Sequence, residues 1–271
     1  MEMTIFKNNV WTQLRQVLSG RQVTPAMLAV LFALGDKKWI DEVADVLKRY
    51  AAGAGYEPTV NNTPTAPTET NHAAAEAIMG SNFLGIAQVE KAFGVKFTPA
   101  QQQKLAMIPE SILKVLKACA RTHILVAGFP LSINNVRANS NVVGNAEQLF
   151  CSMTGTGWYN EQPFANVNVE VRWYLLRKTP VNNSTSRWYK DQLKLLTEGE
   201  ENPWARDVVF ATIALFLTTG ERLFETIWVR CKDTTSFRDR VCLGFSQGGL
   251  LIDDWDVEPY GSIGLASSRN S

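Results

Sequence analysis

Residues 240–255, RVCLGFSQGGLLIDDW, decide the fold class at the C-terminal end of the chain. On both sides of a Ser-Gln-Gly-Gly segment, aliphatic residues recur at every second position, which is typical of short strands. Two further β-prone runs flank the stretch, ERLFETIWVRC before it and SIGLASS after it. We therefore predict several short strands that are separated by polar or glycine-containing turns.

The alternation divides these strands into two sets of side chains. The set predicted to face the core is uniformly aliphatic: Val241, Leu243, Leu250, Ile252, Ile263 and Leu265. The set predicted to be exposed mixes aromatic, aliphatic, acidic and small polar groups: Cys242, Leu251, Asp253, Asp254, Val257, Tyr260 and Ser262. Large apolar groups that are exposed together indicate a recognition surface, and this mixture is typical of antibody-like binding surfaces.

Gly244-Phe245-Ser246-Gln247-Gly248 matches G-x-S-x-G, the nucleophile motif of serine hydrolases. In those enzymes the serine lies between a strand and a helix, and an acid and a histidine follow it along the chain. Here GGLLIDDWDVEPYGSIG follows Ser246 and is a poor helix former, and the chain's two histidines, His72 and His123, both precede it. We therefore predict a turn between two strands, with a hydrolase as the alternative.

Asp253, Asp254, Asp256 and Glu258 form an acidic cluster, but the alternation of calcium-binding EF-hand loops is absent. The four cysteines (Cys119, Cys151, Cys231 and Cys242) are scattered without a C-x-x-C pair, so we expect free thiols. We expect a solvated acidic loop, no metal site and no cofactor.

The rest of the chain predicts two parts joined by a linker. Residues 1–50 show helical spacing, whereas 51–80 include a segment rich in Gly, Ala, Pro, Thr and Asn that predicts a flexible linker. In the second part, residues 81–271, we predict strands within 123–129 and 168–178 and a long helix within 201–220 that ends at Gly220.

Composition excludes several classes of function. The net charge of +1 argues against nucleic acid as a partner. Since no stretch of 18 apolar residues occurs, we expect no membrane span. The first twenty residues lack the pattern of a secretory signal, so we expect a cytoplasmic protein.

The C-terminal run ERLFETIWVRC…RVCLGF…GGLLIDDWD…GSIGLASSR resembles the variable region of proteins diversified by diversity-generating retroelements. The similarity is to the type found in small-genome bacteria and archaea, whose chains close on Gly-(Val/Leu)-Ala-(Ala/Ser)-(Ala/Ser)-Arg. NFLGIAQVEKAFGV, ACARTHILVAG, WYNEQPFA and RKTPVNNSTSRWYKDQ are similar as well, so the resemblance covers about residues 82–269. It implies an α+β, C-type-lectin-like fold that displays varied residues for ligand binding.

Position by position, the resemblance implies a constant frame and a variable region at about 231–269. The frame includes Arg222, Leu223, Phe224, Val241, Gly244, Gly249, Leu250, Trp255, Asp256, Gly264 and Ala266. The variable, ligand-binding set includes Phe237, Asp239, Cys242, Phe245, Leu251, Asp253, Asp254, Val257, Glu258, Tyr260 and Ser262. The implied protein is a hypervariable receptor, not an enzyme, whose unknown ligand is expected to be a protein.

Two other readings remain open. One is an enzyme, either a hydrolase that uses Ser246 or a lectin-fold relative of the formylglycine-generating enzymes. The latter needs reactive cysteines close together near the C-terminus, where only Cys231 and Cys242 occur. The other is a structural protein that assembles through its N-terminal helices.

Overall fold

The computed structural model describes residues 71–142, 149–150, 158–236 and 238–270. The chain divides into two units, Met1–Ala66 and Pro67–Ser271, and the described residues all belong to the second. The predicted helices of residues 1–50, and the predicted linker up to residue 70, lie outside the described residues.

The described part is an α+β fold, as the sequence predicts. Its helices, in chain order, are α4 (His72–Met79), α5 (Ile86–Phe93), α6 (Pro99–Lys104), α7 (Glu110–Leu113), α8 (Leu116–Cys119), α9 (Ile133–Val142), α10 (Tyr189–Leu193) and α11 (Ala205–Thr219), with 3-10 turns η1 (Gly80–Asn82), η2 (Trp158–Glu161) and η3 (Pro163–Asn166). Its strands are β1 (Phe83–Leu84), β2 (His123–Ala127), β3 (Trp173–Arg177), β4 (Trp228–Thr234), β5 (Arg240–Ser246), β6 (Gly249–Trp255), β7 (Ile263–Leu265) and β8 (Ser268–Asn270). None of the helices in the described ranges has the length and apolarity needed to cross a membrane.

The predicted linker extends too far toward the C-terminus, because residues 72–79 form helix α4. Ala75 and Met79, one helical turn apart, are buried, and the ring of His72 packs edge-on against Trp173 with centroids 5.1 Å apart. The composition that predicts the linker belongs to the residues before this helix, whereas HAAAEAIM is rich in alanine, the strongest helix former. The folded domain therefore begins before residue 81.

The local signals for the longer helices act as predicted. Thr98 caps α6 through a reciprocal capping box with Gln101, and Pro99 occupies its first turn. Helix α11 ends at Gly220, whose φ of 77° lies in the left-handed region that glycine adopts without strain. Residues from Ala205 to Leu215 are almost all buried, which is typical of a helix enclosed on every side.

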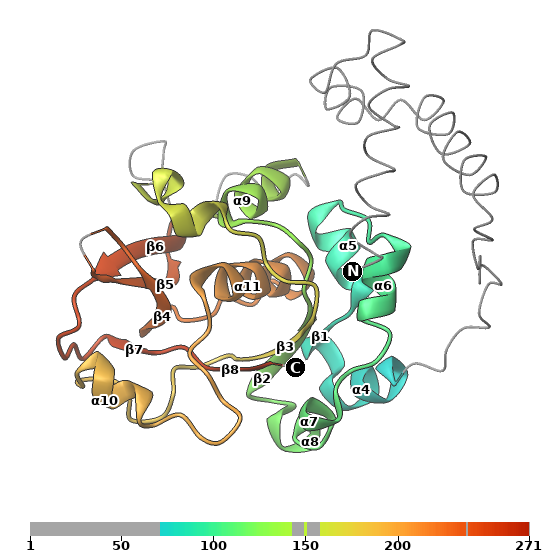
Figure 1. The fold of residues 1–271 in the computed structure, drawn as a ribbon, viewed down its shortest axis with the longest axis horizontal. Helices are drawn as coiled ribbons and strands as arrows, with labels where there is room; N and C mark the ends of the chain where they lie inside the picture. The colour runs from blue at the N-terminus through green and yellow to red at the C-terminus, as the bar shows by residue number, and fades with distance from the viewer. Residues whose placement is uncertain (1–70, 143–148, 151–157, 237, 271) are drawn as a thin grey trace, which may run out of the picture. The chain divides into compact units, whose positions relative to one another are not determined.

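Two four-stranded sheets organise the domain. The first has the order β1-β2-β3-β8, with β1 parallel to β2 and the other pairs antiparallel. The second has the order β6-β5-β4-β7, in which β7 runs parallel to β4. Helix α11 lies centrally (Figure 1), where it contacts α5, α9, β2, β4 and β5. A continuous hydrophobic core therefore joins both sheets through this helix.

The end of the chain passes from one sheet to the other. Strand β7 lies beside β4 in the second sheet, and three residues later β8 pairs with β3 in the first. Between them Ala266 is buried, donates its N–H to the carbonyl of Arg230 at 3.1 Å, and accepts from Asn202 Nδ2 at 3.1 Å. The closing Gly-Leu-Ala-Ser-Ser-Arg segment is therefore structural, since it connects the two sheets.

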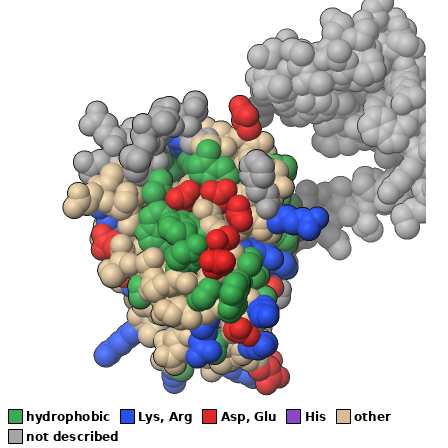
Figure 2. Space-filling model, turned by 90° about the vertical axis from the view of Figure 1, so that its left-hand side faces the viewer, with side chains coloured by type: hydrophobic (Ala, Val, Ile, Leu, Met, Phe, Trp, Pro, Cys, Tyr) green, Lys and Arg blue, Asp and Glu red, His purple; other side chains and the backbone are tan. Residues whose placement is uncertain are grey.

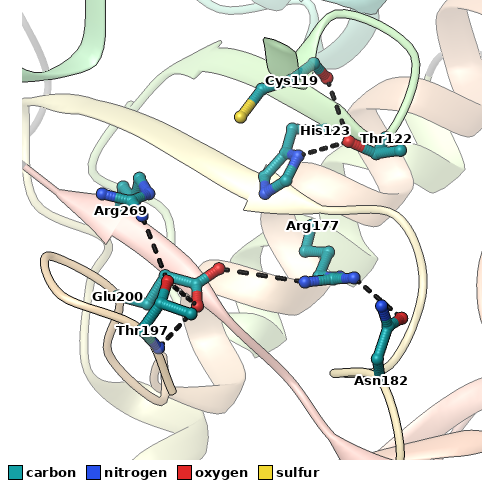
Figure 3. A network of polar contacts seen from close by, with 8 residues as sticks. All are labelled: Cys119, Thr122, His123, Arg177, Asn182, Thr197, Glu200 and Arg269. Atoms are coloured by element: carbon teal, nitrogen blue, oxygen red, sulfur yellow. Dashed lines mark hydrogen bonds and ion pairs between the residues drawn. The ribbon is translucent and has the colours of Figure 1, made fainter. Parts of the chain in front are cut away.

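Polar contacts hold strand β8 in place (Figure 3). Arg269 donates to Thr197 Oγ1 at 3.2 Å, and Glu200 accepts from the Thr197 N–H and hydroxyl at 2.9 and 2.6 Å. Arg177 Nη1 lies 4.0 Å from Glu200 Oε1. Burial, reinforced by the charge of Arg177, lowers the pKa of His123 to about 4, so its ring is neutral at pH 7.

Candidate functional site

The G-x-S-x-G segment is the hairpin turn between β5 and β6, which confirms the predicted turn. Ser246 pairs with Gly249 at the end of the two strands. The Ser246 hydroxyl donates to the Gly249 carbonyl at 3.0 Å and accepts from the Gly248 N–H at 3.2 Å. Gly244 has a packing role, because a Cβ there would lie 2.6 Å from the Trp228 ring. The serine is thus followed by a strand and engaged in its own turn.

The predicted core-facing set is confirmed as buried. Val241, Leu243, Leu250, Ile252, Ile263 and Leu265 are each at most 1% exposed. Val241, Leu243, Leu250 and Ile252 belong to the main core, on the side of the sheet where β4 and β5 contact α11. Ile263 and Leu265 of β7 lie on the opposite face, because they pair with Trp228 and Arg230 in the parallel β4–β7 register. Leu265 packs there with Val181 and Tyr189.

Two predicted ligand-binding residues belong to the interior. Phe245 is 1% exposed and packs against Phe216, with ring centroids 5.4 Å apart. Its odd-numbered position places it with Val241 and Leu243, on the core side of β5. Phe245 is therefore excluded as a contact residue.

Cys242 faces away from α11, as predicted, but is completely buried. Its neighbour across the sheet is Arg230, and the segment after β6 covers both residues through contacts with the Arg230 guanidinium. Burial raises the pKa of the Cys242 thiol to about 12, so it is neutral. The prediction that Cys242 is exposed is wrong, because alternation along a strand does not reveal that both faces are covered.

The acidic cluster divides between two faces of β6. Asp253 pairs with Cys242 and Asp254 with Val241, so their side chains point to opposite sides of the sheet. Both are half-buried, and Asp253 Oδ1 accepts the N–H of Asp254 at 3.0 Å. Within the described ranges, no group of three or more His, Cys, Asp or Glu side chains is arranged to hold a metal ion.

Of the predicted contact residues that remain in β6 and the segment after it, Asp254 lies on the core side of β6, and the others lie on its outer side or in that segment. Together with Trp255 and Asp256, which the resemblance assigns to the frame, they form a region that we call the β6–β7 surface: Leu251, Asp253, Trp255, Asp256, Val257, Glu258, Tyr260 and Ser262. Val257, Glu258 and Ser262 are exposed, and the other five are half-buried. Figure 2 shows hydrophobic and acidic side chains intermingled on the end of the molecule that carries β6. Asp239 is half-buried in the β4–β5 connection, and Phe237 lies outside the described residues.

Arg230 supports this surface from beneath, and sequence analysis did not identify it. Its side chain is fully buried, and Nη2 donates to the carbonyls of Asp256 and Glu258 at 2.9 and 2.5 Å. Nη1 donates to Gln192 Oε1 at 3.1 Å, while Gln192 Nε2 donates to the carbonyls of Ser184 and Ile263. The sequence offers one signal for this role, an arginine within the β-prone run WVRC. An arginine that is buried in a sheet needs several hydrogen-bond acceptors around it.

Three backbone N–H groups hold the same segment. Tyr189 donates to the Val257 carbonyl at 3.0 Å, Ser186 to the Tyr260 carbonyl at 2.8 Å, and Trp228 to the Ser262 carbonyl at 2.9 Å. With the two bonds from Arg230, the carbonyls of five residues are fixed from outside the segment: 256, 257, 258, 260 and 262. None of these five bonds depends on the side chain that the residue carries.

The hairpin is held in a similar way. Arg222 Nη1 donates to the Ser246 carbonyl at 3.3 Å, with its guanidinium over the Phe216 and Phe245 rings. Trp158 Nε1 donates to the Ile252 carbonyl at 2.9 Å. The end of β5 and the middle of β6 are therefore held by residues outside the variable set.

The β6–β7 surface is negatively charged. In the described part of the chain, no ion pair involves Asp253, Asp256 or Glu258. Asp256 accepts hydrogen bonds from the Tyr260 hydroxyl at 3.1 Å and from the Glu258 N–H at 2.9 Å. Burial raises the pKa of Asp253.

No family model matches the chain, and neither a curated protein nor a solved structure gives a significant match.

Proposed function

We propose that this protein is a ligand-binding receptor of the diversity-generating-retroelement type, with the β6–β7 surface as its variable binding site. One observation carries the proposal: residues outside the variable set fix the segment between β6 and β7 through its backbone carbonyls. Side chains there can be replaced without removing these hydrogen bonds. A receptor diversified by mutation needs this separation between what folds and what binds.

The composition of the surface supports the same function. Half-buried Trp255 and Tyr260 lie in contact, with ring centroids 5.0 Å apart, beside exposed carboxylate and aliphatic groups. Aromatic rings provide contact area at a low cost in conformational entropy, and short polar groups adapt their hydrogen bonds. We propose a C-type-lectin-like frame for the domain and a protein as its ligand.

A displayed library tests the proposal without the natural ligand. Leu251, Asp253, Val257, Glu258 and Ser262 are randomised together, and the library is selected against several unrelated folded proteins. We expect most members to remain folded and binders to emerge for several targets. A control library randomised at Leu243, Leu250 and Ile252 should lose nearly all folded members, because these side chains are buried.

Two outcomes would count against the receptor. If the outward library unfolds as often as the inner one, the variable set belongs to the core. The surrounding DNA supplies an independent test, since the proposal requires a nearby reverse-transcriptase gene. It also requires a near-repeat of codons 231–269 that differs mainly at adenines.

A further inference from the structure

The β6–β7 surface carries three carboxylates close together in the chain that have no basic partner. Elsewhere, many carboxylates have one, as in Glu90 with Lys96 at 2.7 Å and Glu221 with Lys178 at 2.6 Å. Asp253, Asp256 and Glu258 take part in no ion pair among the described residues, although the whole chain carries a net charge of +1. These three groups therefore give the surface a local negative charge.

Apolar and aromatic groups lie between these carboxylates. Val257 is 40% exposed, and Leu251, Trp255 and Tyr260 are half-buried. Figure 2 shows acidic side chains directly beside hydrophobic ones, with Lys and Arg mainly toward the edges of the view. Such a surface suits a ligand that combines positive charge with aliphatic groups.

Two arginines on this side of the sheet are engaged within the domain. The Arg230 guanidinium donates to carbonyls and to Gln192, and its Cζ lies 5.8 Å from the centre of the Tyr260 ring, which covers it. Arg240, which pairs with Trp255 in the hairpin, donates to the Lys232 carbonyl at 2.7 Å and lies over the Tyr189 ring. The charged groups that belong to the β6–β7 surface itself are all carboxylates.

We propose that, in this copy of the variable region, the β6–β7 surface binds a cationic protein segment in which Arg or Lys alternates with aliphatic residues. This inference rests on the proposed receptor function and specifies its ligand class. The carboxylates of Asp253, Asp256 and Glu258 pair with the cationic groups, and Trp255 and Tyr260 receive the stems and planes of those side chains.

A random peptide library, selected against the full chain, provides the probe. We expect enriched peptides to be rich in Arg and Lys and to bind more weakly as salt is raised. In the variant Asp253→Asn/Asp256→Asn/Glu258→Gln, the affinity for the best peptide should fall by about tenfold or more, because close opposite charges are removed without a change in shape. The matched control Glu76→Gln/Glu110→Gln/Glu198→Gln neutralises three exposed carboxylates elsewhere and should bind as the wild type does.

The outcomes separate this inference from the function on which it rests. If enriched peptides are neutral or acidic, and binding is lost on changing Leu251 and Val257 to Ser, the ligand class is wrong and the receptor stands. If no enriched peptide depends on the surface, both proposals fail. Binding that EDTA abolishes would assign the carboxylates to a metal ion, and self-association of the chain would assign the surface to a second copy; either result overturns the cationic ligand.

Discussion

Arg230 shows how one residue can fix the segment between β6 and β7. Taking a guanidinium out of water is costly unless its donors are paired, and burial indeed lowers the pKa of this group. Here its donors meet two backbone carbonyls and one amide oxygen. Arg230 stabilises a backbone conformation through hydrogen bonds that do not depend on which side chains the segment carries.

Replacing Arg230 should therefore release the segment between β6 and β7. We expect Arg230→Met to lower the free energy of unfolding by on the order of 3 kcal/mol, because the carbonyls of Asp256 and Glu258 lose a charged donor. Urea denaturation measures the effect, with exposed Arg238→Met as the control. Equal stability of the two variants would contradict the role given to Arg230.

Asp207 gives the domain a pH dependence of definite sign. It is 3% exposed, and burial raises its pKa to about 7 although Arg206 Nε lies 3.6 Å from Oδ1 and Arg172 also opposes the shift. In the unfolded chain the Asp207 carboxyl titrates at about pH 4. Between that pH and the pKa of the folded protein, only the folded state holds the proton. Stability from this residue is full below about pH 4 and is lost as the pH rises toward 7. Nearby Asp233, whose pKa is also raised, acts in the same direction.

Asp207→Asn should remove this dependence. The stability of the variant relative to wild type should increase between about pH 5 and 7, by at most about 1.4 kcal/mol per pH unit. The comparison must be relative, because His123 acts in the opposite sense: its lowered pKa makes stability rise with pH between about 4 and 6.5. Urea midpoints at several pH values measure the difference, with Glu198→Gln as the control. A difference that stays constant with pH would show that Asp207 is ionised when folded.

At the scale of the element, β6 separates core from surface along one strand. Ile252→Ala should cost about 2–5 kcal/mol because it leaves a cavity in the aliphatic layer. Asp253→Ala and Val257→Ala should each change stability by about 0.5 kcal/mol or little more, as is usual away from the core. Phe245→Ala should behave as a core change, since its ring packs on Phe216. Melting curves of the variants measure these effects. If the surface changes lower stability as much as the core changes do, the binding role of the surface is contradicted.

A substitution at Gly264 in strand β7 tests the packing of the closing segment. A Cβ on Gly264 would lie 2.6 Å from Pro180 Cβ and 2.7 Å from Ser184 Oγ, which accepts the N–H of Leu265. Gly264→Ala should cost about 1–3 kcal/mol as these neighbours are displaced. Gly261→Ala is the matched control, because the nearest atom to its Cβ would be 3.8 Å away. If the two variants have the same melting temperature, β7 does not pack as described.

At the scale of the whole molecule, the first described helix completes the core. Helix α4 contributes Ala75 and Met79, and its His72 ring packs on Trp173 of the first sheet. The domain therefore needs residues that composition assigned to a linker.

Two fragments of the chain test this boundary. Fragment 67–271 should keep a cooperative transition, whereas fragment 81–271 should melt lower, because it loses the buried side chains of α4. For a domain of this size each kcal/mol corresponds to about 2–4 °C in Tm. Calorimetry measures the two transitions. Identical melting temperatures would show that α4 adds nothing to the stability of the domain, as a linker that extends to residue 80 requires.

Much of the fold was accessible from short-range patterns. The period of two along RVCLGF and LLIDDW predicted which side chains of β5 and β6 meet α11, and Thr98, Pro99 and Gly220 marked helix ends. The G-x-S-x-G segment could be assigned to a hairpin because the residues after it favour a strand. These features depend on neighbours in sequence, so the sequence by itself determined them.

The tertiary structure decided what covers the outer face of the second sheet. Alternation gives the direction of a side chain but not what lies beyond it, so Cys242 was expected to be exposed and is buried. Arg230 acquires its role from Gln192 and from carbonyls 26 and 28 residues away along the chain. A hydrogen bond to a distant backbone carbonyl leaves no trace in the identity of the residue that accepts it. The segment between β6 and β7 is therefore fixed by contacts that only the folded chain brings together.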